Sequence, residues 1–233
     1  GSGLFLYAET KVSSPLIQFT VFRSAVISAS LAMNVLVAAV MMATLVVGPF
    51  YLSRALGLEP SIVGLAMSIG PVISIFSGVP AGRIVDRLGA PIMVIIGLTA
   101  MVAGAFALSV LPPTFGIAGY IAAIIVLTPG YQLFQASNNT QVMMNIPENE
   151  QGAVSGMLSL SRNIGLITGA SVLGALFAFA SGTSDMTTAD VNAVSNGMQI
   201  TFAVAGGLMV VALGIAVGTL VFSAYRSHQA NVS

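Results

Sequence analysis

Six long apolar runs follow one another along the chain, separated only by short breaks that contain charged residues, proline or glycine. A helix needs about 20 mostly apolar residues to cross a bilayer, and each run has that length. Strands of a membrane barrel would instead be about ten residues long and alternate in polarity. We therefore predict an all-α membrane protein, a six-transmembrane-helix bundle in which every backbone polar group is satisfied within a helix. The predicted spans cover about 24–52, 61–82, 91–111, 115–144, 152–180 and 197–224.

Composition supports a membrane protein and argues against several other classes. Apolar residues make up 56% of the 233 residues and charged residues only 6%, whereas soluble proteins are about a quarter charged. The net charge is zero, so we expect no nucleic-acid partner, because phosphate binding requires a surplus of basic residues. There is no cysteine and a single histidine, His228. We expect no enzyme, no cofactor and no metal site.

The two ends of the chain differ in character from the central 24–224 bundle. Gly1-Ser2-Gly3 is typical of a residual tag sequence and does not enter the fold prediction. We interpret residues 4–23 as a cytoplasmic lead-in and residues 225–233 as a cytoplasmic tail.

The orientation follows from the charged segment Gly82–Gly89, which lies between the second and third runs. Loops on the cytoplasmic side carry an excess of Lys and Arg, and two arginines in so short a segment place it there. If the spans alternate, five cationic residues share that side, Arg54 lies outside and Arg162 lies within a span. The five are Lys11, Arg23, Arg83, Arg87 and Arg226. We therefore expect both termini in the cytoplasm.

The same segment, Gly-Arg-Ile-Val-Asp-Arg-Leu-Gly, resembles the cytoplasmic G-x-x-x-D-R-x-G signature of major facilitator superfamily transporters. Its flanks are similar to the fourteen-helix drug/proton antiporter branch: 14–23 to the lead-in before a helix, 50–61 to the first external turn, and 150–165 to the junction of the fourth and fifth helices. The likeness covers nearly all of 15–180 and is that of a C-terminal six-helix half. Gln18 stands where the lead-in usually has Asp, and Ala90-Pro91 replaces a frequent basic pair.

The resemblance implies half of a secondary active transporter in a bacterial inner membrane. Such a protein exports hydrophobic or amphipathic drugs and other small molecules by alternating access against a second six-helix half, either the N-terminal half of a parent or a second copy. No Asp or Glu lies inside a predicted span, so we expect proton coupling to reside outside this chain. Two alternatives remain open: a natural or engineered half-transporter acting as a homodimer, and a non-transporting structural six-helix module.

Polar residues within the spans are the candidates for a substrate cavity. Four of them, Thr128, Gln132, Gln135 and Asn139, recur at steps of four, three and four and therefore share one face of a helix. The remaining candidates are Tyr131 and Asn138 beside that face, Asn34 in the first span and Arg162 in the fifth. An unsatisfied amide in hydrocarbon is costly, so this face contacts either neighbouring helices or a cavity. Arg162 either lines the cavity or extends back toward the membrane surface.

Two further sets of residues are candidates for conformational change. The first is a cytoplasmic latch, which the resemblance implies; the alternative is a solvated turn that only enforces topology. The latch residues are Gly82, Arg83, Asp86, Arg87 and Gly89. The second set comprises prolines that interrupt helices and glycines that allow helices to approach closely. These hinge and packing residues are Pro49, Pro71, Pro129, Gly165 and Gly169.

Overall fold

The computed structural model describes residues 24–144, 146–182 and 190–230, with side chains as far as residue 222. Within these ranges the protein is built from helices and turns and has no strand. The helices are α2 (Ala25–Phe50) with the π-helical turn η2 (Tyr51–Ala55), α3 (Pro60–Leu88), α4 (Ala90–Met143), α5 (Glu148–Thr168) with the π-helical turn η3 (Gly169–Leu173), α6 (Gly174–Ala180) and α7 (Val191–Ala230). Five helical stretches are long and apolar enough to span a membrane. The predicted all-α membrane fold is confirmed.

Helix α4 folds back on itself, so it supplies two spans. Its 54 residues would extend about 80 Å as a straight helix, far more than the roughly 30 Å of a bilayer core. The break lies at Gly116, whose φ of 59° and ψ of −135° are not helical. Residues 90–115 form a first arm and residues 117–143 a second arm. The predicted third and fourth spans, 91–111 and 115–144, fall on these two arms.

Glycines bring the two arms of α4 into backbone contact. A methyl group at Gly104 would lie 2.8 Å from Cα of Leu127, and one at Gly97 would lie 2.7 Å from the backbone nitrogen of Phe134. Gly119 packs against the backbone of Leu111 in the same way. These pairs have nearly constant sums of residue numbers, as an antiparallel hairpin requires. Small residues at such contacts let helices pack closely where no hydrophobic effect drives association.

The charged segment 82–89 is mostly helical, in contrast to the loop that the sequence suggested. Helix α3 continues to Leu88, and Gly89 alone, at φ 88° and ψ 137°, joins it to α4. Glycine adopts a positive φ without the steric penalty that a side chain would bring. Helix α5 likewise begins at Glu148, before the predicted 152, and Glu148 and Glu150 occupy its first turn, where the helix dipole favours acidic side chains. Helix α7 extends the predicted 197–224 to 191–230.

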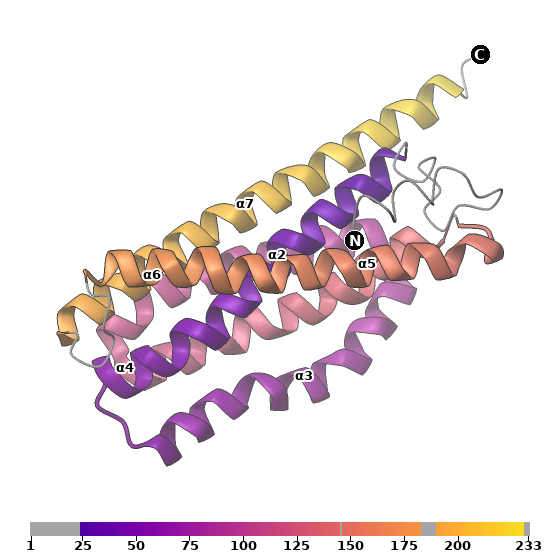
Figure 1. Ribbon diagram of the computed structural model, residues 1–233. Coiled ribbons are helices and arrows are strands. Elements are labelled where there is room, and N and C mark those ends of the chain that lie inside the picture. The colour runs from indigo at the N-terminus through magenta and orange to yellow at the C-terminus, as the bar shows by residue number, and fades with distance from the viewer. Residues whose placement is uncertain (1–23, 145, 183–189, 231–233) are drawn as a thin grey trace.

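The helices lie alongside one another as a bundle with two distinct ends (Figure 1). We call one the Gly89 end, where α2, α4 and α5 begin and α3 and α7 finish. The other is the Gly116 end, with the turn of α4 and the starts of α3 and α7. Arg83 and Arg87 lie at the Gly89 end and Arg54 lies near the Gly116 end.

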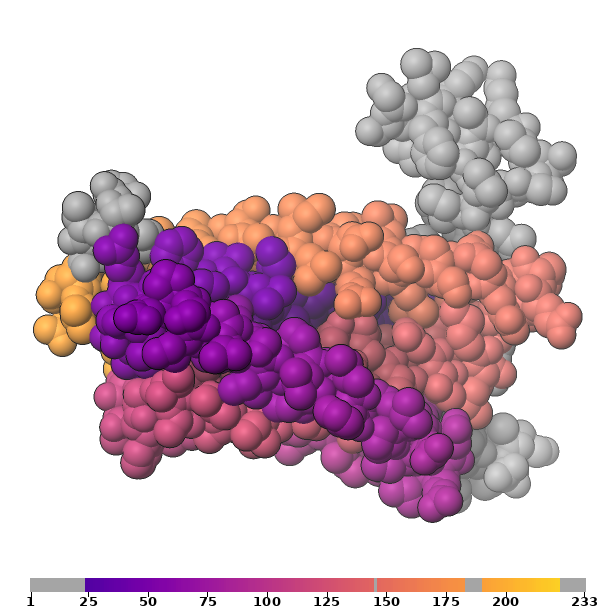
Figure 2. Space-filling model, turned by 90° about the horizontal axis from the view of Figure 1, so that it is seen from below, coloured from indigo at the N-terminus to yellow at the C-terminus, as the bar shows by residue number. Residues whose placement is uncertain are grey.

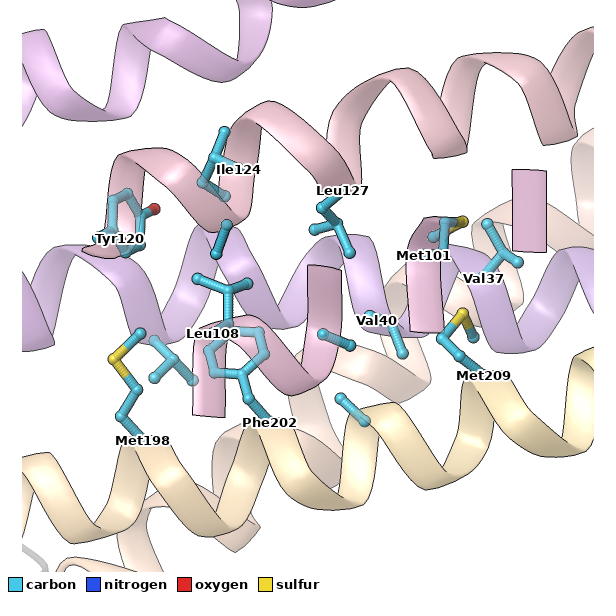
Figure 3. Packing of buried hydrophobic residues seen from close by; sticks show 14 of the residues in the cluster. Val37, Val40, Met101, Leu108, Tyr120, Ile124, Leu127, Met198, Phe202 and Met209 are labelled. Atoms are coloured by element: carbon cyan, nitrogen blue, oxygen red, sulfur yellow. The ribbon is translucent and has the colours of Figure 1, made fainter. Parts of the chain in front are cut away.

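The main core lies between α2, α7 and both arms of α4 (Figure 3). Val37 and Val40 of α2 contact a layer that contains Met101 and Leu127 of α4 and Phe202 of α7, all fully buried. Helix α3 packs on α4, and α5 packs on α2. Figure 2 shows a hollow between α3 and α5 on this face of the molecule. The core therefore fixes α2 and α4 as the floor of an open cleft with α3 and α5 as its sides.

Substituting Gly104 with alanine should lower the stability of the bundle, because the new methyl group would meet Leu127 at 2.8 Å. Overpacking of this kind costs about 1–3 kcal/mol. The matched control is Gly207→Ala on α7, where nothing lies within 4 Å and alanine should gain up to about 1 kcal/mol of helix propensity. Thermal unfolding in detergent should show a lower midpoint for Gly104→Ala only. Equal midpoints for both variants would contradict the hairpin contact.

Candidate functional site

Two cavities open on the side of the bundle between α3 and α5, and Arg162 lines both. The polar cavity, about 290 Å³, lies toward the Gly89 end and is lined by Asn34, Gln135, Asn139, Met143, Ser155, Leu158, Ser159 and Arg162. The apolar cavity, about 350 Å³, is lined by Met41, Thr44, Leu45, Ala66, Met67, Gly70, Pro71, Ser74, Tyr120, Ile124, Thr128 and Arg162. Helices α2, α4 and α5 all contribute to this pair of cavities, and α3 contributes to the apolar one.

Arg162 lies deep along α5. It is 14 residues beyond Glu148, where α5 begins, which corresponds to about 21 Å along the helix. Its side chain is exposed, and within the described ranges it has no carboxylate within 4.0 Å. The described acidic residues, Glu59, Asp86, Glu148, Glu150 and Asp190, lie at or near helix ends. The site therefore contains a cation without a carboxylate partner in the described part of the chain.

Asn34 connects α2 to α5. Its side chain is 3% exposed, and its Nδ2 donates to the carbonyl oxygen of Leu158 and to Oγ of Ser161, each at 2.9 Å. Its Oδ1 has no partner. The predicted packing glycines Gly165 and Gly169 lie farther along the same contact, against the backbones of Val35 and Ala39 of α2. Close approach and a buried amide thus hold α5 on α2, beside the cavities.

The polar face of the second α4 arm both contacts a neighbouring helix and lines the cavities, the two alternatives that the sequence left open. Gln132 binds a neighbouring helix, because its Nε2 donates to the carbonyl oxygen of Ser74 on α3 at 3.1 Å. Gln135 donates to Oη of Tyr131 at 3.2 Å and also lines the polar cavity. Thr128 lines the apolar cavity and Asn139 the polar one. The structure therefore brings Asn34, Thr128, Gln135, Asn139 and Arg162 to the cavities.

Three predicted cavity residues line neither cavity: Gln132, which binds α3, and also Asn138 and Tyr131. Asn138 is fully buried and lines neither cavity, and neither of its amide atoms has a hydrogen-bond partner. Tyr131 is partly buried against the core and reaches the site only through its bond with Gln135.

Several cavity residues were missed from the sequence. Ser155 and Ser159 precede Arg162 on α5 at steps of four and three, the same spacing that marked the polar face of α4. That signal was present in the sequence. Tyr120 gave no such signal; its Oη lies 3.3 Å from Sδ of Met67 and helps to form the apolar cavity.

The predicted latch residues lie at the Gly89 end. Arg83, Asp86, Arg87 and Gly89 are exposed and Gly82 is partly buried, and none of the three charged ones forms an ion pair with another described residue. Val85, between them, is buried against Ala90 and Met93. The segment is thus held on the bundle by buried Val85, and its charged residues are exposed.

The predicted hinge prolines lie inside helices. Pro49 falls two residues before the π-helical turn η2, Pro71 is inside α3 and lines the apolar cavity, and Pro129 is inside the second arm of α4. Each removes one helical hydrogen bond. Their action as hinges remains a prediction.

Membrane-spanning helices around cavities that open on one side are a common arrangement in membrane transporters, and sequence comparison shows that this chain belongs to a family of them. The sequence model of the Major Facilitator Superfamily matches residues 6–170. The chain is 29% identical over 169 residues to an uncharacterised transporter, YebQ, of Escherichia coli. The matched stretch covers 72% of this chain and 37% of the relative. The chain is 23% identical over 174 residues to the multidrug efflux pump LfrA of Mycolicibacterium smegmatis, covering 75% and 34%. It is 26% identical over 179 residues to the multidrug resistance protein Stp of Mycobacterium tuberculosis, covering 76% and 33%.

The chain thus spans only 37%, 34% and 33% of the length of these three relatives. The family is one of transporters, and the recognition of the superfamily from the sequence is confirmed.

Proposed function

We propose that this chain is one half of a secondary active transporter that exports hydrophobic or amphipathic small molecules across a bacterial inner membrane. The observation that carries the proposal is the pair of cavities that share Arg162 and open on one side of the bundle. An apolar pocket with a few convergent polar groups is the usual form of a small-molecule site. The names of the relatives LfrA, Stp and the quinolone resistance protein NorB of Staphylococcus aureus support an exported drug as substrate.

A second six-helix half completes the substrate site in this proposal. The two cavities are open on the side between α3 and α5, and transporters of this kind enclose their substrate between two repeats. Helix α3 also exposes large apolar side chains, with Leu65, Ile75 and Phe76 each at least 70% exposed. Lipid and the second half would cover this surface. That half is the N-terminal half of a longer parent or, in the alternative arrangement, a second copy of this chain.

Proton coupling in this proposal depends on the second half. The described acidic residues lie at or near helix ends, whereas proton relays in membranes use carboxylates or histidines within the spans. The Gly89 end would face the cytoplasm, because it carries Arg83 and Arg87 while Arg54 lies near the other end.

Transport measurements on the purified chain test whether proton coupling depends on the second half. We expect the chain alone in proteoliposomes to show no export of a hydrophobic dye driven by a pH gradient, and the full-length transporter to show it. The measurement is dye efflux after an imposed pH step, with empty liposomes as the control. Proton-driven export by the chain alone would contradict the dependence of proton coupling on the second half and would favour a homodimeric half-transporter. Absence of export from both proteins would favour a structural module.

The charged residues of 82–89 act as a cytoplasmic latch in this proposal. Asp86 lies in the last turn of α3, where the helix dipole disfavours a negative charge, and it has no ion-pair partner among the described residues. The Asp86 carboxylate therefore does not stabilise the fold of this half alone. A basic partner on the second half would explain a negative charge at this position.

Asp86→Asn should leave the unfolding midpoint of the chain unchanged or slightly higher, because the exposed carboxylate has no partner among the described residues. In the full-length transporter it should slow the maximal rate of transport and change the KM little, because the latch controls exchange between states. Glu59→Gln, exposed at the start of α3, is the matched control and should leave the rate unchanged. A large loss of affinity with an unchanged rate would argue against the latch.

A further inference from the structure

We infer that the transported molecule is an amphipathic anion, whose acidic group binds Arg162 and whose apolar body occupies the apolar cavity. The inference rests on the proposed function and adds the charge of the substrate. A carboxylate, sulfonate or phosphate ester would share the required chemistry.

The charge of Arg162 is isolated from carboxylates. The residue lies about 21 Å along α5 from its start at the Gly89 end and has no carboxylate within 4.0 Å in the described parts of the chain. A charge within a membrane span is normally paired or directed into an aqueous cavity. Arg162 has the second arrangement, because it lines both cavities. A site of this kind attracts a negative ligand and repels a positive one.

Polar side chains line the cavity beside that charge. Asn139, Ser155 and Ser159 are exposed within the polar cavity and can donate hydrogen bonds from an amide or a hydroxyl group. Gln135 lines the same cavity and its Nε2 donates to Oη of Tyr131; its buried Oε1 can only accept a hydrogen bond, so it would bind water around the head group rather than the anion itself. Planar guanidinium groups bind carboxylates and related anions through paired hydrogen bonds. The polar cavity thus suits a solvated anionic head group.

The second cavity bordered by Arg162 is mainly apolar. Its walls include Met41 and Met67, whose flexible thioethers adapt to varied apolar shapes. Leu45, Pro71 and Ile124 complete an apolar surface in about 350 Å³. An apolar body here would place its head group at Arg162, since that residue borders both spaces. A hydrophobic cation bound in the same position would lie against an unneutralised guanidinium group.

The test uses three probes with the same apolar body and different head groups: pyrenebutanoate, pyrenebutanol and pyrenebutylammonium. The purified chain is placed in nanodiscs of phosphatidylcholine, which has no net charge and does not compete as an anion. Binding is followed by pyrene fluorescence, with empty nanodiscs subtracted. We expect pyrenebutanoate to bind at least about tenfold more tightly than pyrenebutanol, as hydrogen bonds to charged groups generally provide. Pyrenebutylammonium should bind most weakly.

Variants assign the preference to Arg162. Arg162→Gln should bring the three affinities within about twofold of one another, and Arg162→Lys should retain part of the preference because the charge remains. Arg54→Gln is the matched control, because Arg54 is exposed near the Gly116 end and lines neither cavity. It should leave the tenfold ratio unchanged.

The outcomes separate this inference from the proposed function. Saturable binding of all three probes with no anion preference, or a preference that survives Arg162→Gln, would overturn the inference and leave the cavity intact. Absence of saturable binding by any probe would overturn both. An anion preference that is present in the chain but lost in the full-length transporter would mean that a carboxylate of the second half neutralises Arg162, and it would also overturn the inference.

Discussion

A polar group in hydrocarbon must find a hydrogen-bond partner, a counter-charge or water, and the arrangement of this protein depends on that requirement. The described backbone meets it by forming helices. Most side-chain amides in the spans meet it in one of two ways: Asn34 and Gln132 donate to carbonyl oxygens of neighbouring helices, whereas Asn139 is exposed in the polar cavity. Asn138 is the exception, because it is buried and neither of its amide atoms has a partner. The same requirement makes Arg162 informative, because no described carboxylate neutralises it. The polar residues within the membrane thus serve first to join helices and then to form a site.

Close backbone contact at glycines positions that site. Gly97 and Gly104 bring the two arms of α4 together, and Gly165 and Gly169 hold α5 against α2. These contacts leave the polar faces of α4 and α5 oriented toward the space between α3 and α5. The cavities are therefore a consequence of helix packing, and the charged Gly89 end is a separate feature that a second half would engage.

Much of the fold could be predicted from the sequence, because each membrane crossing is encoded locally by a long apolar run. The local charge pattern, however, gave a wrong boundary for one helix. The charged segment 82–89 looked like a loop, yet α3 continues through it and turns at Gly89 alone, since charges outside the hydrocarbon do not prevent a helix. The sequence placed the break between the third and fourth spans at 112–114, close to the observed turn at Gly116, but it did not distinguish Gly116 as the residue that leaves the helical conformation.

The site was predicted as a helix face and not as a set of contacts. The four-three-four spacing identified the polar face of the second α4 arm, but it could not show that Gln132 binds Ser74 while Asn139 lines a cavity. Those assignments depend on which neighbour each turn of the helix meets. Ser155 and Ser159 could have been found with the same spacing rule. Tyr120 could not, because its role comes from the approach of α2 and α3 around it.

The central claim is that the polar faces of α4 and α5 line a water-accessible cavity. The chain contains no cysteine, so single cysteines placed at Asn139 and Ser159, and at the exposed apolar position Val172 beyond them on the same helical stretch as Ser159, report local access without background. A membrane-impermeant thiol reagent should label the first two positions rapidly and Val172→Cys slowly. Equal labelling of all three positions, or slow labelling at Asn139 and Ser159, would contradict the cavity.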